Sequence, residues 1–213
     1  MDESRVLSEQ QIDALKEVWT IGAGHAATAL AQLTDKKIMI TVPEVKSAPL
    51  NGIVELVGPP ESLMAVVYMT LMGDMLGRTL LIFPKRSAFN LVDILMKRPA
   101  GQTKYLREID YSALKEVGNI LTGSFLTALS EFLDVSFIPS VPLLAYDMVG
   151  GILEAISVEF SQEVDSVFCI QTEFVDPSLD IEGYFMLISD REFLDIIIEK
   201  IDIKIAASGK STG

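Results

Sequence analysis

In the first hundred residues, the hydrophobic and polar positions follow first a helical period, then strand-like runs, then a helical period again. Helical spacing begins after Ser8, which predicts an N-cap at Ser8 with Gln11 at the capping-box position. Short apolar runs bounded by turn residues then predict strands. In order, the pattern predicts a helix at about 9–33, strands at 36–42, 50–57, 62–72 and 78–83, and a helix from Ser87 to Met96.

The second hundred residues repeat this order after a connector from Pro99 to Lys104. The stretch from Ala145 to Ile156 has helical spacing although it contains two glycines, and Ala206 to Gly213 is expected to fray. The predicted elements are a helix at about 109–132, a strand near 134–138, a helix at 145–156, strands near 165–174 and 183–188, and a helix near 190–201.

The chain repeats itself at an offset of 99 residues. Positions 14–18 match positions 113–117 without a mismatch, and the pair Val42-Pro43 falls on Val141-Pro142. A period near 100 residues is too long for a solenoid, whose repeats run to about 50 residues. The sequence therefore predicts two half-domains related by a pseudo-two-fold axis.

No linker rich in Gly, Ser or Pro separates the two halves. We therefore expect a single duplicated α/β (α+β) domain over residues 1–213, with repeats at about 8–98 and 107–203. A hydrophobic content of 49% is enough for a substantial core.

Each repeat carries a polar stripe on its first long helix. With about 100° between successive helical residues, positions spaced by four, three and four residues fall on one narrow stripe, opposite the apolar face. These positions are Ser112, Glu116, Asn119 and Gly123 in the second repeat, and Asp13, Glu17, Thr20 and Gly24 in the first. A carboxylate and a carboxamide three residues apart can form a small polar site, but the first repeat has a hydroxyl in place of the amide.

An isolated Glu-x-x-Asn pair on a helix is ordinary surface chemistry, which is the alternative to a functional site. Asn and Gly are both poor mid-helix residues, Gly by about 1 kcal/mol relative to Ala. The duplication, the common stripe, the glycine and the proline that follows at the same spacing favour a functional site. Gly123 would leave bare backbone that another protein could approach closely.

Composition narrows the possible functions. The formal net charge of −13 argues against nucleic-acid binding, which needs a basic footprint. One Cys, Cys169, excludes an internal disulfide and favours the cytoplasm, and one His leaves no metal-binding signature. The longest apolar stretch, Leu63 to Met72, is far below the roughly 20 residues that span a bilayer, so we expect no membrane insertion.

The duplicated motif resembles the signature of the CheC family of chemotaxis proteins, Asp/Ser-x3-Glu-x2-Asn-x22-Pro. The second repeat has Ser112, Glu116, Asn119 and Pro142 at these positions, whereas the first has Thr20 where the family has Asn. The resemblance covers essentially the whole chain and implies helices packed on a mostly antiparallel sheet. It also implies a phosphatase that hydrolyses the aspartyl phosphate of a CheY-type response regulator.

The resemblance assigns roles to single residues. Glu116 would anchor the regulator and Asn119 would position the attacking water, while Glu17 and Thr20 would form a degenerate second site. Ser112, Gly123 and Asp13 would contact the partner. The chain would need no cofactor of its own, because the regulator supplies the Mg²⁺.

The resemblance further implies binding of CheD, a receptor-modifying deamidase, through the helix after the second-site proline. Here that is Ala145 to Ile156, with Asp147 as the polar candidate and Met148 and Ile152 as exposed apolar contacts. A short buried helix is the alternative for this segment. For the whole chain, a non-catalytic adaptor and a flagellar-switch component are the alternatives to a phosphatase.

Overall fold

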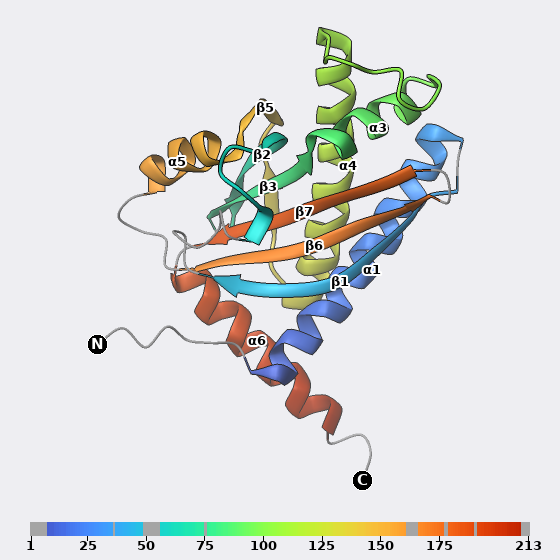
Figure 1. The fold of residues 1–213 in the computed structure, drawn as a ribbon. Coiled ribbons are helices and arrows are strands. Elements are labelled where there is room, and N and C mark those ends of the chain that lie inside the picture. Colours follow the sequence, from blue (N-terminus) through green and yellow to red (C-terminus); the bar gives the residue numbers. More distant parts are fainter. Residues whose placement is uncertain are drawn as a thin grey trace.

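The computed structural model describes residues 8–35, 37–48, 56–74, 76–160, 166–176, 179–189 and 191–209. In the described residues, each repeat begins with a long helix and ends with two consecutive strands followed by a helix (Figure 1). The first repeat contains α1 (Glu9–Thr34), β1 (Met39–Ala48), β2 (Leu63–Gly73), β3 (Gly77–Pro84) and α3 (Lys85–Leu95). The second contains α4 (Glu108–Leu133), β4 (Phe137–Pro139), β5 (Leu143–Met148), α5 (Val149–Phe160), β6 (Ser166–Asp176), β7 (Leu179–Ser189) and α6 (Arg191–Gly209).

The seven strands form one sheet, and every described pairing in it is antiparallel. The strand order is β1-β6-β7-β3-β2-β4, and β5 also pairs with β2. The hairpins β2–β3 and β6–β7 meet at the centre through β3 and β7. Each hairpin is flanked by the first strand of the other repeat, so the two halves exchange their edge strands.

The two prolines of the repeated motif mark corresponding irregularities in these exchanged strands. The pairing of β1 with β6 shifts register between Thr41 and Glu44, where Pro43 lies. Pro142 lies in the break between β4 and β5, both of which pair with β2. Because proline has no N–H to donate to a strand ladder, it interrupts the pairing at the same place in each repeat.

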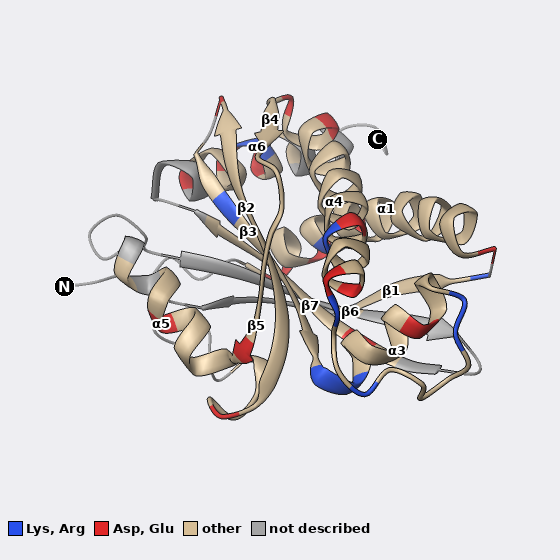
Figure 2. Ribbon diagram, turned by 90° about the horizontal axis from the view of Figure 1, so that it is seen from above, with Lys and Arg blue, Asp and Glu red and all other residues tan. Residues whose placement is uncertain are grey.

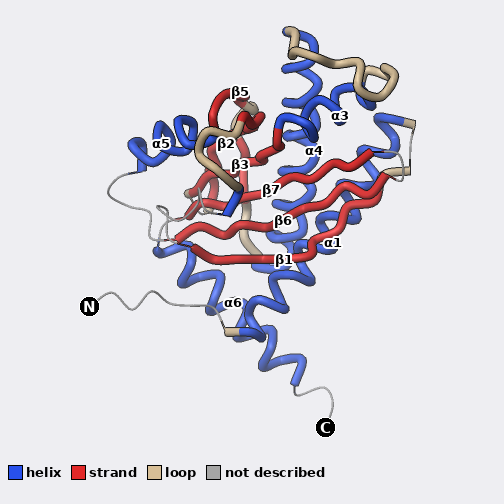
Figure 3. Tube along the Cα trace, viewed as in Figure 1, coloured by secondary structure: helices blue, strands red, loops and turns tan. Residues whose placement is uncertain are grey.

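Both faces of the central strands are buried. Alternate residues of β2, β3 and β7 face a larger core with α1, α4, α3 and α6, and the residues between them face a smaller core with α5. Figures 2 and 3 show α5 and the α1–α4 pair on different sides of the sheet. Burial on two faces explains why β2 is a nearly continuous apolar run rather than an alternating one.

The long helices α1 and α4 have the same length and end in the same way. Each has 26 residues, and each is followed by an aspartate in the left-handed conformation, Asp35 and Asp134, both with φ of 55°. At the start of α1, Ser8 and Gln11 form the expected capping box. The amide of Gln11 also donates to Asp202 of α6 at 2.8 Å, which joins the first and last helices.

Two glycines allow close packing of these helices, and they break the symmetry between the repeats. A Cβ on Gly22 of α1 would lie 2.8 Å from the ring of Phe125 on α4, and a Cβ on Gly118 of α4 would lie 2.5 Å from Val67 of β2. The position in α1 that corresponds to Gly118 holds Trp19, which is 1% exposed. Trp19 packs against Phe125 and Phe185 with ring centroids 5.3 Å apart in both pairs, so packing is its role.

A buried polar network fixes the connector between the repeats. Asp93, at the end of α3, accepts hydrogen bonds from the main-chain N–H groups of Gln102 and Thr103 and from the Thr103 hydroxyl. Arg98 donates to Thr103 at 3.0 Å and to Asp110, in the first turn of α4, at 2.6 Å. The connector is therefore anchored at both of the helices that it joins.

Three predictions from the sequence need correction or fall outside the structure. Residues 145–148, predicted as helix, form the end of β5, because they pair with Leu63–Val66 of β2. The helix begins at Val149. The predicted strand at 50–57 falls mostly outside the described residues, and its last two residues, Leu56 and Val57, are helical. The last helix continues to Gly209, beyond the expected fraying at Ala206.

No helix within the described ranges is long and apolar enough to cross a membrane.

Candidate functional site

The predicted stripe of the second repeat lies on the outer face of α4. Ser112, Glu116 and Asn119 are exposed, whereas Val117 and Leu121, which lie on the other side of the helix, are buried. The Ser112 hydroxyl donates to the main-chain carbonyl of Glu108 at 3.3 Å. The carboxylate of Glu116 and the carboxamide of Asn119 are therefore held one helical turn apart on a surface that a partner protein can reach.

The glycine at the end of the stripe is not required by the packing of this chain. Gly118 could not carry a side chain without displacing Val67, but a Cβ on Gly123 would meet nothing within 4 Å. Gly123 also has no positive φ that would favour glycine. Since glycine costs a helix about 1 kcal/mol relative to alanine, its presence here fits close approach by another molecule.

The corresponding stripe of α1 has the same exposure but different chemistry. Asp13, Glu17, Thr20 and Gly24 are all exposed, and a Cβ on Gly24 would likewise meet nothing within 4 Å. The Thr20 hydroxyl donates to the main-chain carbonyl of Lys16 at 2.7 Å. Its proton is therefore used within the helix, and no amide group remains at this position to hold a water.

Ion pairs between Asp110 and two arginines hold the N-terminal end of α4 in place. Burial raises the pKa of Asp110, but hydrogen bonds from Arg98 and from the Arg107 main chain outweigh this effect and hold the pKa below its ordinary value. Asp110 is therefore an ionised, fully buried anchor for the two arginines. No sequence pattern predicts this cluster, because its members are ordinary charged residues that come together only in the folded chain.

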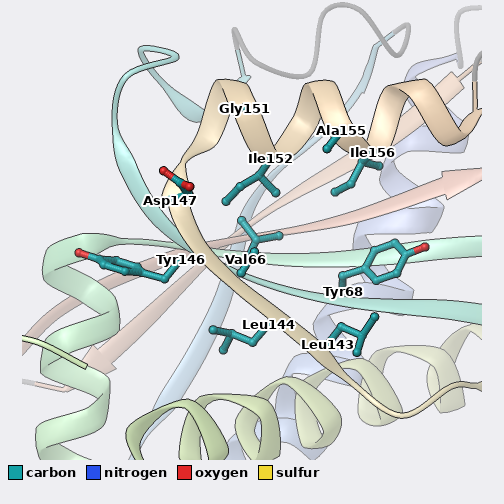
Figure 4. A pocket seen from close by; sticks show the side chains of 11 residues that line it. Val66, Tyr68, Leu143, Leu144, Tyr146, Asp147, Gly151, Ile152, Ala155 and Ile156 are labelled. Atoms are coloured by element: carbon teal, nitrogen blue, oxygen red, sulfur yellow. The ribbon is translucent and has the colours of Figure 1, made fainter. Parts of the chain in front are cut away.

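Asp147 lies outside the α4 stripe, at the end of β5 and just before α5. It is exposed, and its Oδ1 accepts the main-chain N–H of Met148 at 2.8 Å. Figure 4 shows Asp147 at one end of a cavity of about 470 Å³ between α5 and the strands β2 and β5. The cavity wall is mostly apolar; its residues include Val66, Tyr68, Leu144, Ile152 and Ile156.

The neighbours of Asp147 differ from the prediction in one respect. Met148 is half exposed, as expected, but Ile152 is partly buried and packs against the smaller core. The end of β5 therefore offers Met148 to a partner, and α5 contributes the rim of the cavity but no fully exposed apolar face.

Among the described residues, no group of three or more His, Cys, Asp or Glu side chains is placed to hold a metal ion. Cys169 lies on β6, and its side chain is outside the described part of the structure.

A comparison with protein families matches the two segments of the chain that contain the stripes. The model of the CheC-like family matches this chain twice, at residues 11–47 and 110–146. Each matched segment contains one stripe and the proline that follows it. The two matches are offset by 99 residues, the offset of the internal repeat.

The chain is also similar to proteins of known name. It is 32% identical over 206 residues to the CheY-P phosphatase CheC of Bacillus subtilis, which covers 95% of this chain and 97% of that protein. It is 32% identical over 125 residues to the flagellar motor switch phosphatase FliY of the same organism, which covers 58% of this chain and 32% of that protein.

A solved structure supports the fold. The crystal structure of Thermotoga maritima FliY matches with a TM-score of 0.75 and 23% identity, covering 93% of this chain and 99% of that chain. At this level of identity the match shows a shared fold of helices and antiparallel sheet. Together with the nearly full-length similarity to the Bacillus protein, these findings show that the chain belongs to the CheC-like family.

Proposed function

We propose that this chain hydrolyses the aspartyl phosphate of a CheY-type response regulator at the α4 stripe. The observation that carries the proposal is the exposed pair of Glu116 and Asn119, one turn apart on α4 and followed by an unobstructed glycine. The relative of nearly full length bears the name CheY-P phosphatase, which supports the same reaction class.

The proposed chemistry needs only positioning by this chain. Water attacks phosphorus, the bond between phosphorus and the aspartyl oxygen breaks, and the aspartate leaves with the electron pair, so that inorganic phosphate is released. The Asn119 carboxamide has both a donor and an acceptor, and it can hold the water in line with the breaking bond. Glu116 forms an ion pair with a lysine of the regulator and fixes the complex.

The chain contributes no cofactor under this proposal. The Mg²⁺ comes with the regulator and neutralises the charge that develops on the phosphoryl oxygens. No side chain of this protein acts as a nucleophile.

Two alternatives predict different outcomes. A non-catalytic adaptor would bind the phosphorylated regulator through the same stripe without accelerating its dephosphorylation. A flagellar-switch component would act as part of a larger assembly, and the similarity to FliY keeps this alternative open. The retained Glu116–Asn119 pair favours the phosphatase.

The degenerate site offers a gain-of-function test. In an Asn119→Ala background, Thr20→Asn is expected to restore dephosphorylation to about a tenth or more of the wild-type rate, because it supplies the missing amide beside Glu17. The measurement is the decay of phosphorylated regulator in the presence of each variant. A double variant no faster than Asn119→Ala alone would show that the missing amide is not what inactivates the first stripe.

We further propose that the rim of the cavity next to Asp147 binds CheD. The exposed carboxylate, the half-exposed Met148 and the apolar cavity wall together form a surface suited to an apolar partner segment with a basic residue at its end. This surface is formed by α5 and the strands β2 and β5, whereas the stripe lies on α4 (Figure 2).

Charge reversal tests this second surface. Asp147→Lys is expected to weaken CheD binding at least tenfold, a typical effect of placing like charges across an interface. Titration calorimetry would measure the dissociation constant, with Glu154→Lys as the control, since Glu154 is exposed on α5 but does not line the cavity. Equal affinities for the wild type and Asp147→Lys would reject the assignment.

A further inference from the structure

The connector between the repeats is basic in an otherwise acidic protein. Residues 97–107, the basic connector, contain Lys97, Arg98, Lys104 and Arg107 and no Asp or Glu, whereas the whole chain has a formal net charge of −13. Figure 2 shows Lys and Arg segments along the path from α3 to the start of α4. Such a local reversal of charge indicates a surface for an anionic partner.

The structure divides the four cations into those that are used internally and those that face outward. Arg98 is mostly buried and is held by Thr103 and Asp110, and Lys97 pairs with Asp35 at 2.7 Å. Lys104 is exposed, and none of the ion pairs described for this structure includes it. Arg107 is exposed over 54% of its side chain, although its Nε lies 3.4 Å from Asp110.

Lys104 and Arg107 line a shared hollow. A cavity of about 170 Å³ is bounded by Arg98, Gln102, Thr103, Lys104, Tyr105 and Arg107. Two buried carboxylates are bonded to these side chains within the described ranges: Asp110, which Arg98 and Arg107 share, and Asp93, which accepts the Thr103 hydroxyl, so the three cations of the lining outnumber them. The hollow therefore has an excess of positive charge, and the buried network of Asp93 and Thr103 holds it in shape.

The basic connector leads directly into the helix that carries the candidate site. Arg107 is the residue before α4, and Asn119 lies twelve positions further, about 18 Å along the helix axis. A standard protein interface of about 800 Å² per partner spans this distance. A single partner can thus contact the connector and the stripe together.

The proposed partner has the complementary charge. Protein-bound Mg²⁺ next to a phosphate is held by carboxylates, so the face of a regulator that presents an aspartyl phosphate is acidic. An acidic protein repels such a face unless a local basic surface attracts it.

The sequence directly before α1 has the opposite charge. At the offset of 99, residues 100–107 correspond to residues 1–8. The side chains of 100–107 carry two positive charges, Lys104 and Arg107, whereas those of 1–8 carry Asp2, Glu3 and Arg5, a net charge of −1. The charge difference thus favours binding of an acidic partner at the repeat that retains Asn119 over binding at the repeat that has Thr20.

We propose that the basic connector is the docking surface for the acidic, phosphate-bearing face of the regulator and directs it to α4 instead of α1. The inference rests on the proposed function, since it assigns the partner of that same site. Lys104 acts here as a positioning residue that contacts the partner protein, and Asn119 remains the group next to the reacting water.

Lys104→Glu tests the proposal, with Lys200→Glu as the matched control at the far end of the molecule on α6 (Figure 1). At about 10 mM ionic strength, Lys104→Glu is expected to lower kcat/KM for the phosphorylated regulator about tenfold and to leave kcat unchanged, because charge steering acts on association. The difference should shrink at about 1 M salt. Equal salt-dependent kcat/KM values for Lys104→Glu and Lys200→Glu would overturn the proposal.

A binding measurement separates this proposal from the proposed function. Regulator carrying beryllofluoride, which mimics the aspartyl phosphate, is titrated with the wild type and both variants. Weaker binding by Lys104→Glu alone supports the docking surface even where the wild type shows no hydrolysis. Unchanged binding by Lys104→Glu rejects the docking surface even where the wild type is an active phosphatase.

Discussion

Asn119→Ala is expected to lower the rate of regulator dephosphorylation by about 10²–10³, the usual effect of removing one positioned hydrogen-bonding group from a reaction site. The side chain is exposed on α4 and lies one turn from Glu116, so its removal leaves the fold unchanged. The rate is measured as the decay of phosphorylated regulator at saturating concentration of this protein, so that a change in binding does not enter.

The stability of this variant separates catalysis from folding. Alanine is a better helix residue than asparagine by up to about 0.7 kcal/mol, so Asn119→Ala is expected to unfold at a slightly higher denaturant concentration than the wild type. Gln32→Ala is the matched control, since it removes another exposed carboxamide from a helix. Retention of half or more of the activity by Asn119→Ala would show that another group positions the water.

Trp19→Ala is expected to destabilise the protein by about 3–5 kcal/mol, the range for removing a large aromatic side chain from a core. Trp19 fills a space between α1 and the sheet, and it contacts both Phe125 and Phe185. The corresponding position of the second repeat, Gly118, has no room for a side chain. Chemical denaturation followed by circular dichroism gives the free energy of unfolding.

Two further variants define the origin of this effect. Trp19→Phe should cost less than Trp19→Ala, because it keeps a ring and removes the indole N–H, for which the described structure offers no acceptor. Thr20→Ala, at the exposed neighbouring position, should change the free energy of unfolding by less than about 1 kcal/mol. A loss below about 1 kcal/mol for Trp19→Ala would mean that the packing around the indole contributes little to stability.

The sequence predicts the helices well, because their signals are local. The 3.6-residue period and the capping residues Ser8 and Gln11 place α1 within about one residue of its observed ends. The repeat then transfers the same assignment to α4, and the shared stripe follows from helix geometry alone. These features depend on neighbours within a few residues, which the sequence contains.

The elements that the sequence misses depend on distant residues. Residues 145–148 have a spacing that fits a helix, but pairing with β2, about 80 residues earlier in the chain, makes them a strand. The exchange of edge strands between the repeats is likewise invisible without the pairing partners. The hydrogen bond from Thr20 to Lys16 could have been expected, since threonine in a helix commonly donates to the carbonyl four residues before it.

The candidate site likewise has a part that follows from local sequence and a part that depends on distant residues. Glu116 and Asn119 are placed by the period of one helix, and the sequence predicts their exposure and separation. The basic connector is visible as a run of charge, but its shape depends on Asp93 and Asp110, which flank it and bond to it only in the folded chain. A charge count therefore could not tell which of its cations remain available to a partner.

The most direct measurement is the turnover of phosphorylated CheY-type regulator by the wild-type chain at about one-tenth of the regulator concentration. We expect the whole pool of regulator to lose its phosphate much faster than it does alone, because each molecule of this protein acts many times. Decay at the unassisted rate, with binding of the phosphorylated regulator intact, would contradict the phosphatase and leave an adaptor.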